Sequence, residues 1–198
     1  MTARGSYRGT EEKQARILQA AFEIFANGGY DAASVRSIAA AAGMSHPGVL
    51  HHFPTKQALL EAVLLAHDRT EEAAFRELWT SPTVETFAEA IAATVALDQQ
   101  TPALNRLRAR LAAAGSDPQH PAHSFAETRY QRLSGQIHAN LHRLHEAGEL
   151  TTTLSTSDAA DILLGLLDGL GARWLCHPQL DTPRLVREAV LQLLNPDQ

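Results

Sequence analysis

Apolar residues recur at helical spacing along almost the whole chain, and no segment alternates between apolar and polar residues as a strand does. The first such run carries Ile17, Ala21 and Phe25 on one face. It is expected to begin at an N-cap residue, Thr10, and to end at the "NGGY" segment. Similar runs follow to the end of the chain. The pattern therefore predicts an all-α fold of about nine helices, without internal repeats.

Two of the predicted helices are short and lie close together near the amino terminus. Ser34 is expected to cap the first, which ends at Gly43, a residue that can adopt the left-handed backbone conformation. Ser45 is expected to cap the second, and only "AGMS" separates the two helices. This arrangement predicts a helix-turn-helix, in which the second helix lies in the major groove of DNA.

The leading turn of that second helix, "SHPG" in "SHPGVLHH", is nearly free of bulky side chains. A helix that enters a groove about 12 Å wide needs a slim leading turn, which Pro47 and Gly48 provide. His46 is predicted to face base edges, whereas His51 and His52 are predicted to lie near phosphates. The histidines thus serve as candidate hydrogen-bond donors at a DNA surface.

The segment "GMSHPGVLHHFPTKQALL", with "ILQAAFEIFANGGYDAASVRSIAAAAG" before it, resembles the DNA-binding domain of the tetracycline-repressor (TetR) family of bacterial transcriptional regulators. The resemblance implies an all-α, homodimeric repressor that releases its palindromic operator when a small molecule binds the carboxy-terminal body. It also implies a DNA-binding domain over residues 10–64, with a recognition helix at about 45–52. A helical regulatory and dimerisation domain is then expected over 65–198.

Comparing this sequence with the family's motif, residue by residue, gives a set of candidate DNA contacts. Lys56, at the start of the fourth helix, matches a lysine that binds phosphate. Leu50 departs from the family, which usually has a tyrosine there, so no operator sequence can be transferred. The full set is Ser34, Arg36, Ser37, Ser45, His46, Gly48, His51, His52, Thr55 and Lys56.

Composition and charge narrow the function classes. The chain has 198 residues and a formal net charge of -5, but residues 1–60 carry six Lys or Arg against four acids. This uneven distribution of charge favours binding of a polyanion by the amino-terminal part of the chain. A single cysteine excludes an internal disulfide, and no apolar run is long enough for a membrane span or signal peptide. We therefore expect a cytoplasmic protein without membrane association.

The last two predicted helices are expected to form the dimer interface. The first is apolar almost all round and rich in glycine, so it needs burial on two sides, against its own body and against a partner helix. Two helices from each subunit would build a four-helix interface. A purely internal core helix is the alternative. The candidate interface residues are Leu163, Leu166, Leu167, Leu170, Trp174, Leu185, Val186, Val190 and Leu193.

Candidates for an effector pocket are polar residues beside apolar stripes, namely Asn105, Arg108, His138 and Asp168. His138, His142 and His145 also share one helical stripe. A half-exposed stripe is favoured over a metal site, because no H-E-x-x-H motif, no cysteine pair and no carboxylate that would orient the histidine ligands supports a metal.

No resident metal or cofactor is expected, and no sequence motif indicates a catalytic residue or an enzyme. The alternative function is a helical adaptor with a vestigial helix-turn-helix, which predicts no salt-dependent binding to DNA. The identity of the small-molecule effector does not follow from the sequence.

Overall fold

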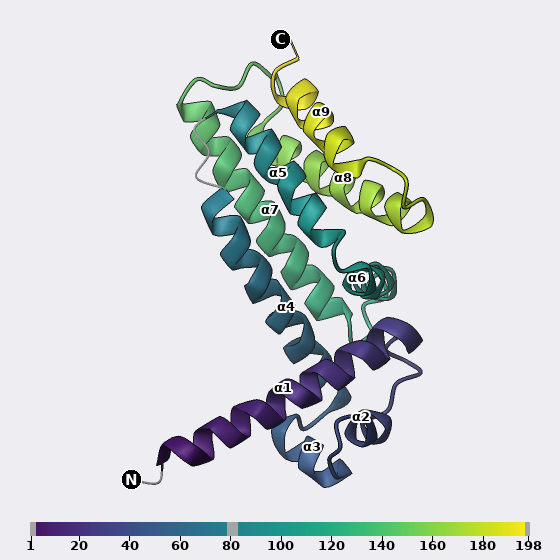
Figure 1. Cartoon of the computed structure of the whole chain (residues 1–198). Coiled ribbons are helices and arrows are strands. Elements are labelled where there is room, and N and C mark those ends of the chain that lie inside the picture. Colours follow the sequence, from purple (N-terminus) through teal and green to yellow (C-terminus); the bar gives the residue numbers. More distant parts are fainter. Residues whose placement is uncertain (1–2, 79–82, 197–198) are drawn as a thin grey trace.

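The computed structural model describes residues 3–78 and 83–196, and this part of the chain is all-α (Figure 1). The prediction of an all-α fold with about nine helices is confirmed. No helix among these residues combines the length and apolar character that crossing a membrane requires. The elements are α1 (Ala3–Gly28), α2 (Val35–Ala41), α3 (His46–His52), α4 (Lys56–Leu78), α5 (Val84–Asp98), α6 (Pro102–Ala114), α7 (His123–Glu146), α8 (Thr156–Cys176) and α9 (Thr182–Leu194).

Helix α1 begins earlier than the sequence pattern predicted. Thr10 is not its N-cap but lies inside the helix, which starts at Ala3. The segment before Thr10 contains no proline, and glycine costs a helix only about 1 kcal/mol, so nothing there stops the helix from extending. The other end is as predicted, because α1 ends at Gly28 and Gly29 follows with φ +81°.

Helices α1 to α4 share one apolar core at one end of the molecule. Its largest fully buried side chains include Ile17, Phe25, Ile38 and Leu59. Leu64 belongs to the same core, although α4 continues beyond it toward the body. The apolar pattern of the sequence predicts that this helix reaches as far as Trp79, which lies outside the described residues. The amino-terminal unit is therefore joined to the body by a continuous helix.

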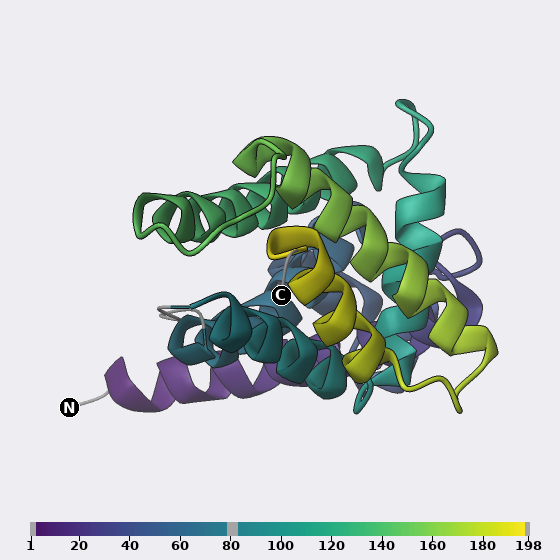
Figure 2. The same ribbon diagram turned by 90° about the horizontal axis from the view of Figure 1, so that it is seen from above.

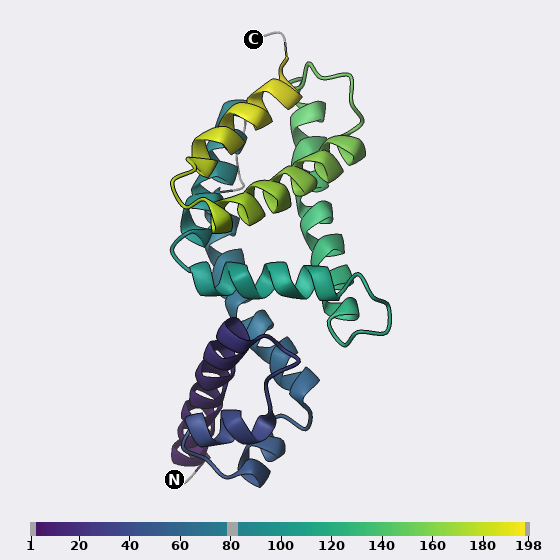
Figure 3. The same cartoon turned by 90° about the vertical axis from the view of Figure 1, so that its right-hand side faces the viewer.

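Helix α6 crosses between this unit and the remaining helices (Figure 3). Leu107 and Leu111 on α6 are buried in the same core as α1 and α4, together with Ala122 from the loop after α6. Helix α6 also contacts α7 and α8. It therefore packs against both parts of the molecule.

The second core is formed by α5, α7, α8 and α9. Helix α9 packs against α5, and α8 packs against both α7 and α9; Figure 2 shows this group from above. Fully buried side chains at its centre include Phe87, Leu141 and Val186. Ser155 caps α8 and Asp181 caps α9, each side chain accepting a hydrogen bond from a backbone N–H in the first turn. Local signals in the sequence therefore set the start of both carboxy-terminal helices.

Candidate DNA-binding surface and internal pocket

Each helix of the α2–α3 pair begins with a side-chain cap, as predicted. The Ser34 hydroxyl accepts a hydrogen bond from the Ser37 backbone N–H at 3.0 Å, and the Ser37 hydroxyl donates to the Ser34 carbonyl at 2.7 Å. Between the helices, Gly43 has φ +65°, a conformation that favours glycine. Arg36 is exposed beside the Ser34 cap. The amino-terminal turn of α2 is therefore fixed in place with an exposed cation on it.

Helix α3 is anchored by one buried side chain, and its other residues are exposed or half-buried. Val49 is fully buried in the amino-terminal core, while His51 is exposed and His46 and His52 are half-buried. The Ser45 hydroxyl accepts from the Gly48 backbone N–H at 3.2 Å. A Cβ on Gly48 would lie only 3.0 Å from that same hydroxyl oxygen. Gly48 therefore leaves room for the Ser45 cap and also keeps the leading turn slim.

Lys56 lies at the first turn of α4, with its ammonium directed at the α1–α2 loop. Its Nζ donates to the carbonyl oxygens of Tyr30 at 2.9 Å, Ala33 at 3.1 Å and Asp31 at 3.4 Å. The same nitrogen lies 4.2 Å from the centroid of the Tyr30 ring. Burial raises the pKa of the Tyr30 phenol, with smaller contributions from Asp31 and Glu61. Lys56 therefore holds the loop that leads into α2.

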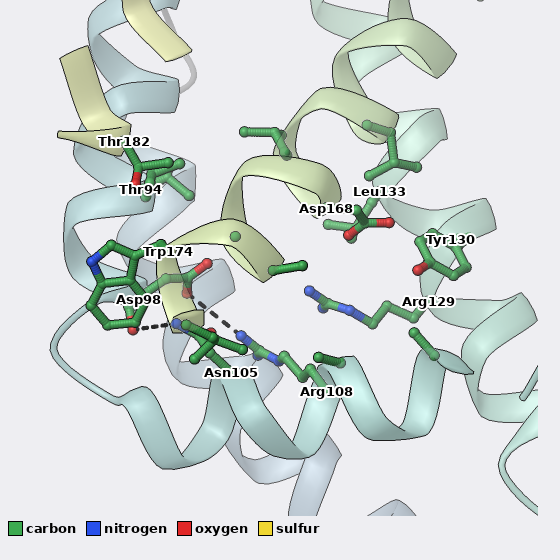
Figure 4. Close-up of a pocket in the computed structure, with 18 of the residues that line it drawn as sticks. Thr94, Asp98, Asn105, Arg108, Arg129, Tyr130, Leu133, Asp168, Trp174 and Thr182 are labelled. Carbon is green, nitrogen blue, oxygen red and sulfur yellow. Dashed lines mark hydrogen bonds and ion pairs between the residues drawn. The ribbon is translucent and has the colours of Figure 1, made fainter. Parts of the chain in front are cut away.

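A cavity of about 320 Å³ lies among α5, α6, α7 and α8. Three of the four residues predicted for an effector pocket, Asn105, Arg108 and Asp168, line it (Figure 4). The walls are mostly apolar. Side chains that form them include Ile91, Val95, Leu133, Ile137, Leu164 and Leu167.

The polar groups of the cavity form two clusters. In the first, Arg108 Nη1 lies 3.5 Å from the Asp98 carboxylate, and the Asn105 side chain donates to the Asp98 carbonyl at 2.8 Å. In the second, Tyr130 lies beside Asp168 (Figure 4). Burial, followed by the interaction with the Asp168 side chain, raises the pKa of Tyr130 to about 12. Tyr130 is therefore a neutral phenol at physiological pH.

Comparison with known proteins shows which protein family has this arrangement. Residues 17–63 match the family described as "Bacterial regulatory proteins, tetR family". The regulator UidR of Escherichia coli K12 is 27% identical over 176 residues, covering 88% of this chain and 84% of UidR. The repressor Rv3405c of Mycobacterium tuberculosis is 50% identical over 56 residues, 28% of this chain and 30% of Rv3405c. The chain belongs to the TetR family of transcriptional regulators.

The fold is also found among solved structures. A TetR transcription regulator from Haloarcula marismortui superposes with a TM-score of 0.78, at 16% identity, covering 94% of this chain and 98% of that one. The shared fold therefore extends over both parts of the molecule.

The predicted dimer residues of this TetR-family regulator fall into different environments. Leu163, Val186 and Val190 are buried in the carboxy-terminal core of the chain itself, so they cannot reach a partner. This part of the prediction is wrong, because helical periodicity does not separate an inward apolar face from an outward one. Leu167 and Trp174 line the cavity. The partly exposed members of the set are Leu166, Leu170, Leu185 and Leu193.

The histidine stripe lies on the outer face of α7. His138 does not line the cavity, because its neighbour Ile137 points inward and consecutive helical residues are about 100° apart. The His138 and His142 rings stack with centroids 6.3 Å apart, and His142 Nε2 lies 3.5 Å from Glu146. Within the described part of the chain, no group of three or more His, Cys, Asp or Glu could hold a metal ion.

Several residues that line the cavity were absent from the predicted pocket. Thr94, Asp98, Arg129 and Tyr130 line the cavity, as does Trp174, which was assigned to the dimer interface instead. A signal for Arg129 existed in the sequence, because it is a cation directly before an aromatic residue of the apolar stripe of α7. Periodicity alone did not show that this edge of the stripe faces a cavity.

Proposed function

We propose that the protein is a dimeric repressor that binds a palindromic operator and is released when a small molecule enters the α5–α8 cavity. One observation carries this proposal: a capped helix-turn-helix with an exposed recognition face is packed through α6 against a helical body that contains a cavity. Residues 10–64 form the DNA-reading unit, and residues 65–198 form the regulatory unit.

On DNA, His46 and Gly48 approach base edges in the major groove, whereas Arg36, His51 and His52 face phosphates. The remaining hydroxyl groups lie at helix starts, where backbone N–H groups also favour phosphate. They belong to Ser34, Ser37, Ser45 and Thr55. Lys56 contributes chiefly by holding the α1–α2 loop, because its ammonium donates to three carbonyl groups there.

Helix α6 carries the signal between the two units. Asn105 and Arg108 line the cavity, while Arg110 on the same helix donates to the carbonyl oxygens of Ala26 at 3.2 Å and Asn27 at 3.3 Å. These carbonyl groups belong to the last turn of α1. An occupant of the cavity that shifts α6 therefore also shifts α1, and with it the helix-turn-helix. A typical coupling of about 1–3 kcal/mol weakens operator binding about 5- to 150-fold.

A second contact from the same region supports this route. His120, in the loop after α6, places its Nε2 3.5 Å from the Asp31 carboxylate, and its ring meets the edge of Tyr30 at 5.9 Å between centroids. Tyr30 in turn lies under Lys56. The loop after α6 thus contacts the segment that leads into α2.

Dimerisation uses the outward face of α8 together with α9. Ile162 is 47% exposed, and Gly165 and Gly169 are exposed on the same helix, where their lack of side chains lets another helix approach closely. Leu166 and Leu193 are half-buried at this surface. Two-fold symmetry then sets the recognition helices about 34–36 Å apart, one turn of DNA.

The test is selection of a binding site from random duplex DNA by the full-length protein at two salt concentrations. We expect a palindromic motif whose affinity falls as salt rises, because phosphate contacts release counterions. With His46→Ala, base preference should relax at one position in each half-site. If no motif is enriched, or if the affinity for DNA does not depend on the salt concentration, a helical adaptor is favoured instead.

A further inference from the structure

The charged groups that line the cavity balance each other. Two guanidinium groups, from Arg108 and Arg129, and two carboxylates, from Asp98 and Asp168, belong to the lining (Figure 4). Arg108 Nη1 lies 3.5 Å from the Asp98 carboxylate. Among the described residues that line the cavity, no other Asp, Glu, Lys, Arg or His is present. The lining therefore carries no net formal charge.

A charged ligand would gain little from such a lining. An ion that moves from water into an enclosed and mostly apolar space loses hydration, and only a group of opposite charge compensates for that loss. Here the carboxylates already compensate for the guanidinium groups, so neither sign of charge on a ligand meets an excess of the other. An uncharged ligand loses no such hydration. The charge balance therefore favours an uncharged ligand.

Two uncharged polar groups of the lining lack hydrogen-bond partners among the described residues. They are the hydroxyl oxygen of Thr94 on α5, a residue only 9% exposed, and the side-chain nitrogen Nε2 of Gln99 at the end of the same helix. The Asn105 side chain, by contrast, already donates to the Asp98 carbonyl at 2.8 Å. A buried donor without a partner is destabilising, so a ligand with an acceptor oxygen is favoured over a hydrocarbon.

Most of the remaining lining is apolar, with Leu133 and Ile137 from α7 and Leu164 and Leu167 from α8. The volume of about 320 Å³ lies at the small end of ligand pockets. We propose that the effector is a small uncharged molecule with an apolar body and a hydroxyl or carbonyl group. Its oxygen forms a hydrogen bond with the Thr94 hydroxyl, and its body lies against the apolar side chains of α7 and α8. This inference rests on the proposed regulatory role of the cavity.

The test measures ligand binding directly, without DNA. Full-length protein is titrated by calorimetry at neutral pH with 4-phenylbutan-1-ol and 4-phenylbutan-2-one, which are uncharged. The comparison compounds are 4-phenylbutyrate, 4-phenylbutylamine and butylbenzene, which share the apolar body but carry a negative charge, a positive charge or no oxygen. Because burial of an unpaired ion is costly, the alcohol or the ketone should bind at least about tenfold more tightly than either ion.

The variant Thr94→Val locates the oxygen of the ligand, because valine keeps the branched shape of threonine but has no hydroxyl. The quantity compared is the affinity for the tighter of the two oxygen compounds divided by the affinity for butylbenzene. In Thr94→Val this ratio should fall about 2- to 13-fold, the effect of one neutral hydrogen bond. Thr153→Val is the matched control and should leave the ratio unchanged, since Thr153 is exposed and does not line the cavity.

Melting of ligand-free Thr94→Val gives a second readout. Its Tm should equal or exceed that of wild type, because the substitution removes a buried polar group that has no partner. A lower Tm would mean that the hydroxyl is already bonded within the protein, and the proposal would then be wrong. The same melting curve shows whether the variant used in the titrations is folded.

The outcomes separate the ligand class from the repressor function. Ions that bind as well as the uncharged compounds, no binding by the alcohol or the ketone, or an unchanged ratio in Thr94→Val would each overturn the proposed class. Protein that selects an operator but fails these titrations loses only the ligand class. Protein that prefers the uncharged compounds but selects no operator retains the ligand class and loses the repressor function.

Discussion

The ammonium group of Lys56 donates a hydrogen bond to the carbonyl oxygen of Tyr30 at 2.9 Å, joining the start of α4 to the loop before α2. Two further carbonyl groups and the Tyr30 ring share the same charge. Lys56 therefore orders the amino-terminal turn of α2, which carries Arg36. Lys56 can therefore affect DNA binding in two ways that can be measured separately: by holding the loop in place and by its positive charge.

We predict that Lys56→Met lowers stability by about 1.5–3 kcal/mol, the range for hydrogen bonds to charged groups, and weakens DNA binding. The slope of log affinity against log salt should stay unchanged, because the phosphate contacts are made elsewhere. Arg36→Gln is the comparison and should reduce that slope by about one without a similar loss of stability. A reduced slope in Lys56→Met would instead place Lys56 on phosphate.

The network around α6 predicts that Arg110→Gln weakens operator binding even though Arg110 is on α6 rather than on the helix-turn-helix. Its loss frees the carbonyl groups of Ala26 and Asn27 at the end of α1. A coupling of about 1 kcal/mol corresponds to about a fivefold loss of affinity, which a binding titration resolves. Arg106→Gln changes the same charge on the same helix and should bind as wild type. Equal affinities for both variants would argue against α6 as the route.

The sequence predicted the helix-turn-helix well because its determinants are local. The Ser34 and Ser45 caps and the turn at Gly43 each depend on residues within three or four positions. The role of Lys56 was not predictable in this way, since its carbonyl partners lie 23 to 26 residues away and come together only in the folded chain.

The cavity was predictable only in part for the same reason. Asn105, Arg108 and Asp168 stand out as polar residues beside apolar stripes. Tyr130 did not, because its ring belongs to the apolar stripe of α7 and its neighbour Asp168 comes from another helix. His138 was misplaced because periodicity gives the angle between neighbours but not which face a second helix covers.

Two glycines give a matched test of packing. A Cβ on Gly115 would lie 2.8 Å from the Cβ of Ala126 and 2.9 Å from the carbonyl of Leu111. We predict that Gly115→Ala costs about 1–3 kcal/mol through overpacking and lowers Tm by several degrees. Gly135, exposed within α7, has no such neighbour within 4 Å. Gly135→Ala should therefore raise stability by about 0.4–1 kcal/mol in the same melting experiment.

The burial of Tyr130 beside Asp168 predicts a measurable pH dependence. The pKa of Tyr130 is raised from 10.0 to about 12, so the phenol is favoured in the folded chain. Its stabilising contribution is complete below pH 10 and is lost as pH rises through about 12. Ultraviolet titration of phenolate formation should show a late step that disappears in Tyr130→Phe. In Asp168→Asn that step should move toward pH 10, and an unmoved step would mean that burial alone sets the shift.

The proposed dimer surface is tested by comparing an exposed with a buried apolar residue of the carboxy-terminal helices. Ile162 is 47% exposed, whereas Val190 is fully buried in the core of the chain. Ile162→Arg should yield a folded monomer, because the new charge meets a partner helix but little of its own chain. Val190→Ala should instead lower stability by about 2 kcal/mol through lost burial and a small cavity, while leaving a dimer at working concentration.

Light scattering and thermal melting, measured on both variants, separate these effects. A monomer that keeps its Tm but loses affinity for the selected operator would link the α8 surface to the reading of paired half-sites. If Ile162→Arg remains dimeric, the interface lies elsewhere on the molecule. If Ile162→Arg loses the dimer and unfolds at the same time, the folded unit is the dimer itself. The stability must then depend on protein concentration.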